Sequence, residues 1–294
     1  MHTTLGLRSA DVGARAWASR ITPERAAFLF VIANFAFLGG DIAIAHLANH
    51  FAARVEWAPI VFSVLAVPLL LLGVLGIGPP RVTRRIDLAV ASCAILVGVL
   101  GMLFHLASGF FVERTLHSLV YAAPFAAPLA YVGVGLLAIL VRMEPAGSRA
   151  FGPWVLMLAV GGFGGNFALS VLDHAQNGFF SPTEWIPVVA AAFGASFFLI
   201  AVLRPRPTFL RMCFFVCGGE AIVGLLGFAL HLVSEGGSPT ASLLDRLVFG
   251  APVFAPLLFA NMALLASIGL WATLANVPIV RGGASTAGVR ARAF

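Results

Sequence analysis

Lysine is absent from this chain, so each of its 18 basic residues is an arginine. Without a lysine amine the protein cannot hold retinal as a Schiff base, and lysine nucleophiles are excluded. Charge is scarce as well, since 10% of the 294 residues are charged while 60% are hydrophobic. A soluble globule needs more polar surface, and the apolar runs exceed the roughly 18 residues that mark a bilayer span. The sequence therefore predicts an integral membrane protein.

Cysteine is also rare, and the motifs of soluble enzymes are missing. Cys93, Cys213 and Cys217 lie in apolar stretches without a partner at metal-site spacing, so we interpret them as small packing residues. The chain has no nucleotide-binding glycine loop, nucleophile elbow, zinc-protease motif or iron–sulfur cysteine set. Chemistry of these soluble types therefore has no support.

Eight apolar segments follow one another along the chain, each long enough to cross about 30 Å of hydrocarbon. They cover residues 26–49, 57–77, 86–109, 118–142, 153–174, 185–203, 209–234 and 246–275. The alternating strands of a closed barrel are absent, so the spans are helices. We expect an all-α integral membrane protein with eight transmembrane helices.

The arginines are distributed unevenly between the two sides of these spans. Fifteen lie in the tails and in the loops after the second, fourth and sixth spans, whereas Arg54, Arg114 and Arg246 lie on the other side. Because positive residues are retained in the cytoplasm, both termini are expected there, in a bacterial-type inner membrane. The positive-inside rule and contacts between arginine and anionic lipid together explain the basic charge of the chain. The lipid bilayer is therefore an expected partner, and nucleic acid is not.

The chain contains an internal duplication with an offset of 125 to 128 residues. The recurring elements are Gly98, Gly101 and His105 with Gly224, Gly227 and His231, Glu56-Trp57 with Glu184-Trp185, and Ala123-Pro124 and Ala127-Pro128-Leu129 with Ala251-Pro252 and Ala255-Pro256-Leu257. Because each half holds an even number of spans, the halves share one orientation about a pseudo-two-fold axis along the membrane normal.

The expected organisation is therefore two parallel four-helix repeats between short tails. We expect a cytoplasmic N-terminal tail over residues 1–25, the first repeat over 26–142, a cytoplasmic linker over 143–152, the second repeat over 153–275 and a cytoplasmic C-terminal tail over 276–294. Every even span opens near a proline, so at a finer level the repeats also divide into four helical hairpins.

Histidines and carboxylates collect at the outer ends of the expected spans. All histidines except His2 lie there: His46, His50, His105, His117, His174 and His231. His46 with His50 and Glu113 with His117 are four residues apart, a spacing by which two side chains on one helix bind zinc, iron or copper. His174 and Asp245 are further candidate ligands. The alternative is that these residues are solvated helix caps.

His105 and His231 lie before the ends of their spans, within apolar sequence, where an imidazole needs a partner. As a pair across the pseudo-two-fold axis they could be the axial ligands of haem b, with Gly98, Gly101, Gly224 and Gly227 leaving room for the ring. The alternative is that these glycines mark close helix packing.

Two acids lie deeper in the expected spans and do not recur as acids. Asp41 follows Gly39-Gly40 and has Asn166 as its expected counterpart, and Glu220 has Ala94. Acids in lipid are costly, so they indicate a cavity or a proton path, or else a protonated acid bonded to a neighbouring helix.

Three classes of function fit these patterns. The favoured one is a metalloprotein or redox protein with its centre at the outer, periplasmic face, for electron transfer or oxidation of a small or lipidic substrate. A periplasmic electron carrier or a larger membrane complex would be its partner. The second class is a transporter of small molecules or ions, indicated by parallel repeats, prolines within spans, and Asp41 and Glu220. The third is a scaffold or assembly subunit.

Overall fold

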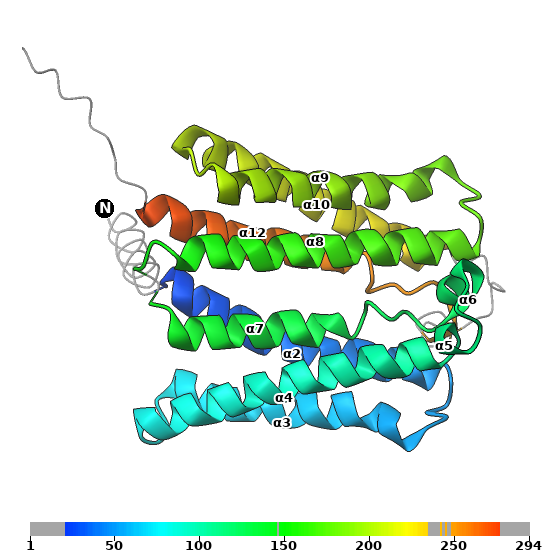
Figure 1. Cartoon of the computed structure of the whole chain (residues 1–294), viewed down its shortest axis with the longest axis horizontal. Helices are drawn as coiled ribbons and strands as arrows, with labels where there is room; N and C mark the ends of the chain where they lie inside the picture. The colour runs from blue at the N-terminus through cyan, green and yellow to red at the C-terminus, as the bar shows by residue number, and fades with distance from the viewer. Residues whose placement is uncertain (1–20, 146, 235–241, 243–244, 246–247, 277–294) are drawn as a thin grey trace, which may run out of the picture.

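A computed structural model describes residues 21–145, 147–234, 242, 245 and 248–276 of the chain (Figure 1). Most of both expected cytoplasmic tails, with His2 and all of their arginines except Arg25, lies outside these residues, as do Glu235 and Arg246. Within the described ranges the chain is helical and contains no strand.

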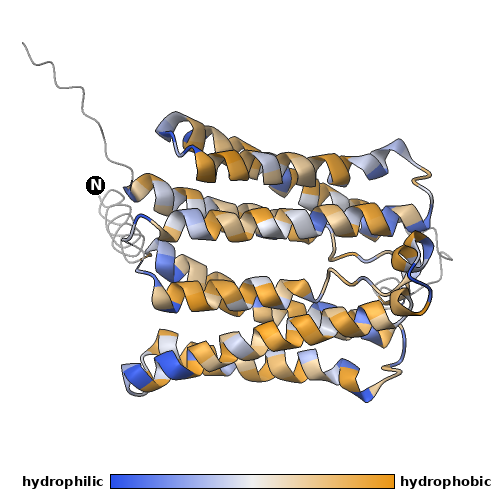
Figure 2. Ribbon diagram, in the orientation of Figure 1, coloured by the Kyte–Doolittle hydropathy of each residue, from blue (hydrophilic) through white to orange (hydrophobic). Residues whose placement is uncertain are grey.

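Seven helices of the described chain are long and apolar enough to cross a membrane. They are α2 (Pro23–Leu47), α3 (Ala58–Leu75, preceded by η1, Arg54–Trp57), α4 (Pro80–Ala107), α8 (Phe151–Gln176), α9 (Trp185–Leu203, preceded by η2, Pro182–Glu184), α10 (Pro207–Ser234) and α12 (Leu257–Asn276). A shorter apolar helix, α7 (Leu129–Met143), follows the short helices α5 (Phe110–Glu113) and α6 (Leu116–Tyr121). Hydrophobic residues cover the middle of the bundle and hydrophilic ones its two ends (Figure 2). The prediction of an all-helical, multi-pass membrane protein is confirmed at this level.

Local sequence explains where several of these helices begin and end. The Thr22 hydroxyl accepts a hydrogen bond from the backbone N–H of Arg25 at 3.2 Å, and Pro23 occupies the first turn of α2. Helix α3 ends at Gly76, whose φ of 69° is left-handed and is the usual conformation at a glycine C-cap.

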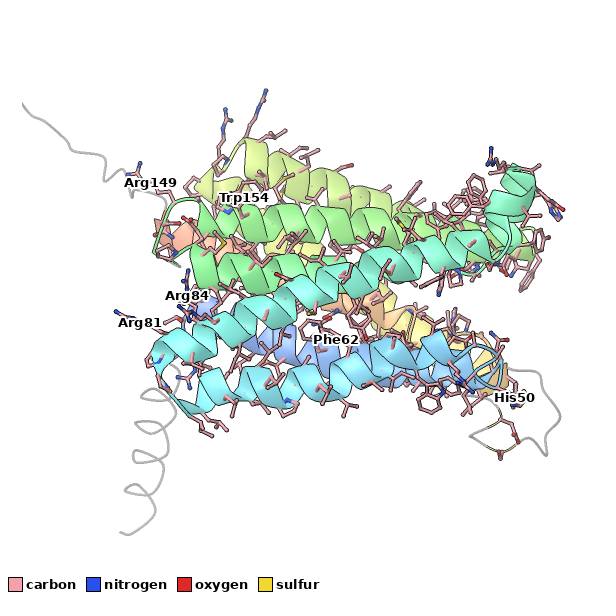
Figure 3. All side chains as sticks on the ribbon, turned by 60° about the horizontal axis from the view of Figure 1, so that its bottom comes forward. His50, Phe62, Arg81, Arg84, Arg149 and Trp154 are labelled. Carbon is pink, nitrogen blue, oxygen red and sulfur yellow. The ribbon has the colours of Figure 1, made fainter. Side chains whose placement is uncertain are left out.

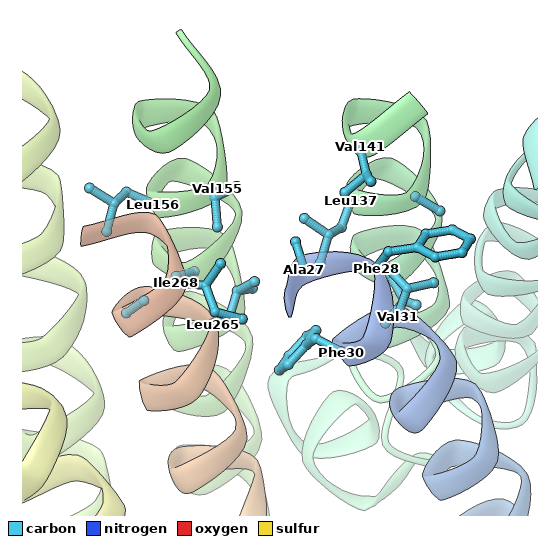
Figure 4. Close-up of a cluster of buried hydrophobic side chains, with 14 of the residues drawn as sticks. Ala27, Phe28, Phe30, Val31, Leu137, Val141, Val155, Leu156, Leu265 and Ile268 are labelled. Carbon is cyan, nitrogen blue, oxygen red and sulfur yellow. The ribbon is translucent and has the colours of Figure 1, made fainter. Parts of the chain in front are cut away.

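The helices form four neighbouring pairs, in the order α3 with α4, α2 with α7, α8 with α12, and α9 with α10 (Figure 1). The two central pairs hold much of the core, which Figure 4 shows at one end. There Phe28 and Val31 of α2 lie toward Leu137 and Val141 of α7. In the next pair the corresponding contact joins α8 and α12 through four side chains: Val155, Leu156, Leu265 and Ile268.

The two halves of the chain meet where α2 approaches α12 and α7 approaches α8. At the first of these contacts the side-chain amides of Asn34 and Asn261 each donate a hydrogen bond to the other, one of them with an N–O distance of 3.3 Å. Asn34 also donates to the backbone carbonyl of Phe30 at 2.9 Å, so its polar group is satisfied inside the core.

The expected continuous span over residues 118–142 is wrong, because the chain leaves the α-helix between Tyr121 and Leu129. Pro124 and Pro128 lie in this interval, and a proline lacks the N–H that a helix interior needs and clashes with the preceding turn. The second half repeats the break, since α12 begins only at Leu257, after Pro252 and Pro256. We call residues 122–128 and 250–256 the two proline segments.

Glycines of α4 and α10 accommodate the proline segments at close range. A Cβ atom on Gly98 would lie 2.8 Å from the Pro128 carbonyl oxygen, and one on Gly101 would lie 2.9 Å from Pro128 Cβ. In the second half, a Cβ atom on Gly224 would lie 2.8 Å from the Pro256 carbonyl oxygen, and one on Gly227 would lie 2.7 Å from Pro256 Cβ. The space that these glycines leave is therefore filled by prolines, and the expectation that they leave room for a haem ring is wrong.

Candidate functional site: two histidine clusters

The two ends of the bundle differ in their side chains. Arg81, Arg84 and Arg149 lie at one end and His50 at the opposite end (Figure 3). We call these the arginine end and the histidine end. His46, His105, His174 and His231 each lie in the last turn of a long helix, α2, α4, α8 and α10 respectively, and all four of those turns are at the histidine end.

In the first half, three of these polar side chains come together; we call His46, Glu56 and His105 the first cluster. His46 Nδ1 lies 3.3 Å from a carboxylate oxygen of Glu56, and the rings of His46 and His105 are 6.3 Å apart, edge to face. His105 Nδ1 lies 3.0 Å from the backbone carbonyl oxygen of Pro124. Elements from α2, η1, α4 and the first proline segment thus converge on one site.

The second half repeats this arrangement, in what we call the second cluster of His174, Glu184 and His231. His174 Nδ1 lies 3.6 Å from a carboxylate oxygen of Glu184, and His231 Nδ1 lies 3.1 Å from the carbonyl oxygen of Pro252. Glu184 is buried, with 8% of its surface exposed. The duplication therefore covers contacts between residues that are distant in the sequence, and not the residues alone.

A matching aromatic pair closes the loop beside each cluster. Phe51 stacks on Trp57 with ring centroids 4.1 Å apart, and Phe179 stacks on Trp185 at 4.2 Å. Both phenylalanines have positive φ, 50° and 52°, a conformation that is uncommon for a non-glycine residue. Each tryptophan directly follows the glutamate of its cluster, so the stacked rings lie next to the cluster in the chain.

The proline carbonyls determine which nitrogen of each imidazole carries hydrogen. A carbonyl oxygen can only accept, so Nδ1 of His105 donates to Pro124 and Nδ1 of His231 donates to Pro252. Each of these carbonyls also accepts a backbone hydrogen bond within its proline segment, from the N–H of Ala127 and of Ala255 respectively, both at 3.1 Å. The histidine is therefore a second donor to an oxygen atom that has two lone pairs.

The ligand pairs expected from a spacing of four residues do not share a helix. His50 lies beyond the end of α2, is exposed and has a φ of 53°. Glu113 ends α5 and His117 lies in α6, with Arg114 in a left-handed conformation between them. Both of these side chains are exposed, and their role as ligands stays a prediction.

Asp245 forms a local cap and belongs to neither cluster. Its carboxylate accepts hydrogen bonds from the backbone N–H of Ser242 at 3.1 Å and from the Ser242 hydroxyl at 2.7 Å. These two bonds hold the pKa of Asp245 below its ordinary value, because they favour the charged form.

No three His, Cys, Asp or Glu side chains in the described ranges are placed to hold one metal ion together. The contacts instead select pairs of histidines, each pair oriented by a glutamate and a carbonyl. Glu56 and Glu184 are not among the ligands expected from helical spacing. A sequence signal for them exists, since His46 and Glu56 are ten residues apart and so are His174 and Glu184.

The deep acids Asp41 and Glu220 lie on α2 and α10, the helices that carry His46 and His231, but they precede these histidines by five and eleven residues. The matched histidines set an offset of 128 residues between α2 and α8, so Asp41 corresponds to Leu169, and the expected match with Asn166 is wrong. Asp41 is partly buried in α2. Glu220 is buried in α10, at 3% exposure.

A further buried acid, Asp87 of α4, was not expected from the sequence. Arg142 Nε donates to its carboxylate at 2.7 Å, and the guanidinium lies 3.8 Å from the centroid of the Phe28 ring. Arg84 Nε donates to the Arg142 carbonyl at 3.2 Å. The sequence does contain a signal for this ion pair, because Asp87 is the one acid near the arginines at the start of α4. It was overlooked because the positive-inside rule already accounted for Arg142.

The chain matches no family model, and neither curated proteins nor solved structures show a match to it.

Proposed function

We propose that the chain crosses the membrane eight times, with α7 and the first proline segment forming the fourth crossing. The two halves are then parallel, with the arginine end in the cytoplasm of a bacterial-type inner membrane and the histidine end in the periplasm. The excess of arginine at one end supports this orientation. The matched clusters support parallel halves, because both lie at the same end of the bundle.

We propose further that the paired imidazoles of each cluster bind a transition metal, either an iron, copper or zinc ion or the iron of haem b. The observation that carries this proposal is the placement of His46 and His105, whose ring centroids are 6.3 Å apart. Nδ1 of His105 donates to the Pro124 carbonyl, which leaves its Nε2 with a lone pair, and Nδ1 of His46 lies 3.3 Å from the Glu56 carboxylate. Metal-binding histidines commonly have their other nitrogen held in this way.

A centre of this kind would serve electron transfer, or the oxidation of a small or lipidic substrate, at the periplasmic surface. The two imidazoles of a cluster would supply nitrogen ligands to a haem iron or to a bare ion, which would supply the redox chemistry. A periplasmic electron carrier or a larger membrane complex would exchange electrons with it.

Metal reconstitution tests the proposal directly. Protein purified in detergent and stripped with chelator is titrated separately with Cu²⁺, Zn²⁺, Fe²⁺ and haem, and binding is followed by optical spectra and by metal analysis after gel filtration. We expect saturable binding of one of these probes, and His105→Leu should weaken binding at the first cluster roughly a hundredfold or more, because an imidazole ligand is lost.

Two further variants separate ligand loss from damage to the fold. His117→Leu removes a side chain of the ligand pair expected from helical spacing, which the proposed clusters do not use, so this variant should bind like the original protein. His105→Gln keeps a donor for the Pro124 carbonyl, so it should fold normally and still bind weakly. The metal proposal is wrong if no probe binds saturably, or if His105→Leu and His117→Leu bind alike.

Transport is the alternative that a specific observation favours. Discontinuous spans in matching positions of two repeats are typical of transporters, whose sites lie beside the broken helices. The first proline segment separates α6 from α7, and the second lies directly before α12, so the two breaks occupy matching positions in the two halves.

On the transport hypothesis Asp41 carries protons or binds the transported ion. Asp41→Asn should then reduce substrate or proton flux in proteoliposomes at least tenfold while leaving thermal unfolding unchanged. The control is Glu113→Gln, an exposed acid at the histidine end. Equal flux in Asp41→Asn and Glu113→Gln would contradict the hypothesis.

A further inference from the structure

A groove runs between α9 and α10. These two helices are the outermost pair of the second half (Figure 1). Its walls are apolar and exposed, with Val189 at 61% and Phe215 at 83% of their surface accessible. In a membrane this face meets hydrocarbon, so a ligand reaches the groove from the bilayer and not from water. The volume of about 680 Å³ is in the range of small-molecule sites.

One polar side chain interrupts the apolar lining, the carboxyl group of Glu220. It is 3% exposed, and its Oε2 atom has no hydrogen-bond partner in the described chain. None of the ion pairs among the described residues involves Glu220. An uncompensated carboxylate at this depth is too costly, so the group is a neutral acid with one O–H to donate.

The remaining lining favours a flat ring. Trp185, Phe193 and Phe215 border the groove, and aromatic rings of this kind pack against planar ligands at low conformational cost. Trp185 begins α9 at the histidine end, whereas Glu220 lies near the middle of α10. The groove therefore extends from the membrane interface toward the bilayer centre, which suits a molecule with an apolar tail.

We propose that this groove binds a lipid-soluble quinone, with a ring carbonyl accepting the Glu220 proton donor. The carbonyl supplies the acceptor that the neutral acid lacks, the ring lies beside Phe193 at the depth of Glu220, and the tail follows the apolar walls. Water-soluble and anionic ligands do not fit, because the walls are apolar and none of the described residues that line the groove is a cation. This binding goes beyond the proposed metal centre and does not depend on it.

The first half of the chain supplies a matched control for this site. Trp57 corresponds to Trp185, but Ala94 stands where the second half has Glu220. Ala66 likewise stands in place of Gly194, where an added Cβ atom would come within 2.9 Å of Glu220 Oε1. The corresponding face between α3 and α4 therefore lacks the acid and should not bind the quinone.

Tryptophan fluorescence tests the proposal in phosphatidylcholine nanodiscs with a benzoquinone that carries a decyl chain. Two variants each retain one tryptophan, Trp185 or Trp57, with the other four changed to phenylalanine. We expect saturable quenching of Trp185 and only linear, unsaturable quenching of Trp57. Chelator-treated protein is used throughout, so failure of the metal proposal leaves this result unaffected.

Changes at the acid and at the exposed ring complete the test. Glu220→Ala, which copies the first half, should bind at least tenfold more weakly, and Glu220→Gln, which keeps a donor, should stay within about threefold of the original affinity. Phe215→Ala removes an exposed ring and should weaken binding without affecting folding. Saturable quenching of Trp57, unchanged affinity in both Glu220→Ala and Phe215→Ala, or a phospholipid that the quinone cannot displace would overturn the proposal.

Discussion

Asp87→Cys alone should lower the free energy of unfolding by about 3 kcal/mol, because it leaves the Arg142 guanidinium without its buried partner. Arg142→Leu alone should cost a similar amount, since it leaves Asp87 uncompensated at 1% exposure. The double variant should recover most of this loss. Buried ion pairs can often be replaced as a unit by apolar side chains at little cost.

The second half of the chain shows that the apolar pair is compatible with this fold. At the offsets of 126 for α4 and α10 and 128 for α7 and α12, Cys213 stands for Asp87 and Leu270 for Arg142, and both are fully buried. Reversible unfolding in mixed detergent measures all four proteins as a double-mutant cycle. Additive losses in the double variant would show that the two side chains do not act as a pair.

Gly98→Ala should destabilise the protein by about 2 kcal/mol, because the added methyl group meets backbone atoms that cannot rotate away. The Cβ atom would lie 2.8 Å from the Pro128 carbonyl oxygen and 2.9 Å from the Val132 nitrogen. Helix α4 would have to move away from α7, which also disturbs the approach of His105 to Pro124. The unfolding midpoint measures the first effect, and metal affinity at the first cluster measures the second.

Gly133→Ala is the matched control on α7, where an added Cβ atom would have nothing within 4 Å. Alanine is the better helix former, so this change should leave stability unchanged or raise it slightly. Gly224→Ala should repeat the loss in the second half, since its Cβ atom would lie 2.8 Å from the Pro256 oxygen. Equal stability of Gly98→Ala and Gly133→Ala would contradict the packing argument.

Much of the helical pattern could be predicted from the sequence, because length and hydropathy are local properties. Seven expected spans contain a long helix with ends within a few residues of the expected ones, apart from the later start of α12. The prolines before α7 and α12 indicated interrupted spans, but the sequence did not show that the α-helix stops there. Prolines also occur inside continuous helices, as Pro68 does in α3, so the residue type alone does not decide the outcome.

The histidine clusters were harder to predict because their contacts join distant segments. A spacing of four residues indicates a shared helix face only where the helix continues. Helix α2 ends at Leu47, before His50, and α5 ends at Glu113, where Arg114 is left-handed. His46 and His105 come from different helices, and only packing brings them together. The repeated ten-residue interval between His46 and Glu56 was the one local signal of this contact.

The amide pair between Asn34 and Asn261 makes the two halves unlike partners. At the offset of 128 residues, Asn34 corresponds to Gly162 and Asn261 to Gly133. Two copies of the first half facing each other would set Asn34 against Gly133, and two copies of the second would set Gly162 against Asn261. Each such pairing would leave an amide in the core without its partner. The contact therefore favours the pairing of a first half with a second half over the pairing of two identical halves.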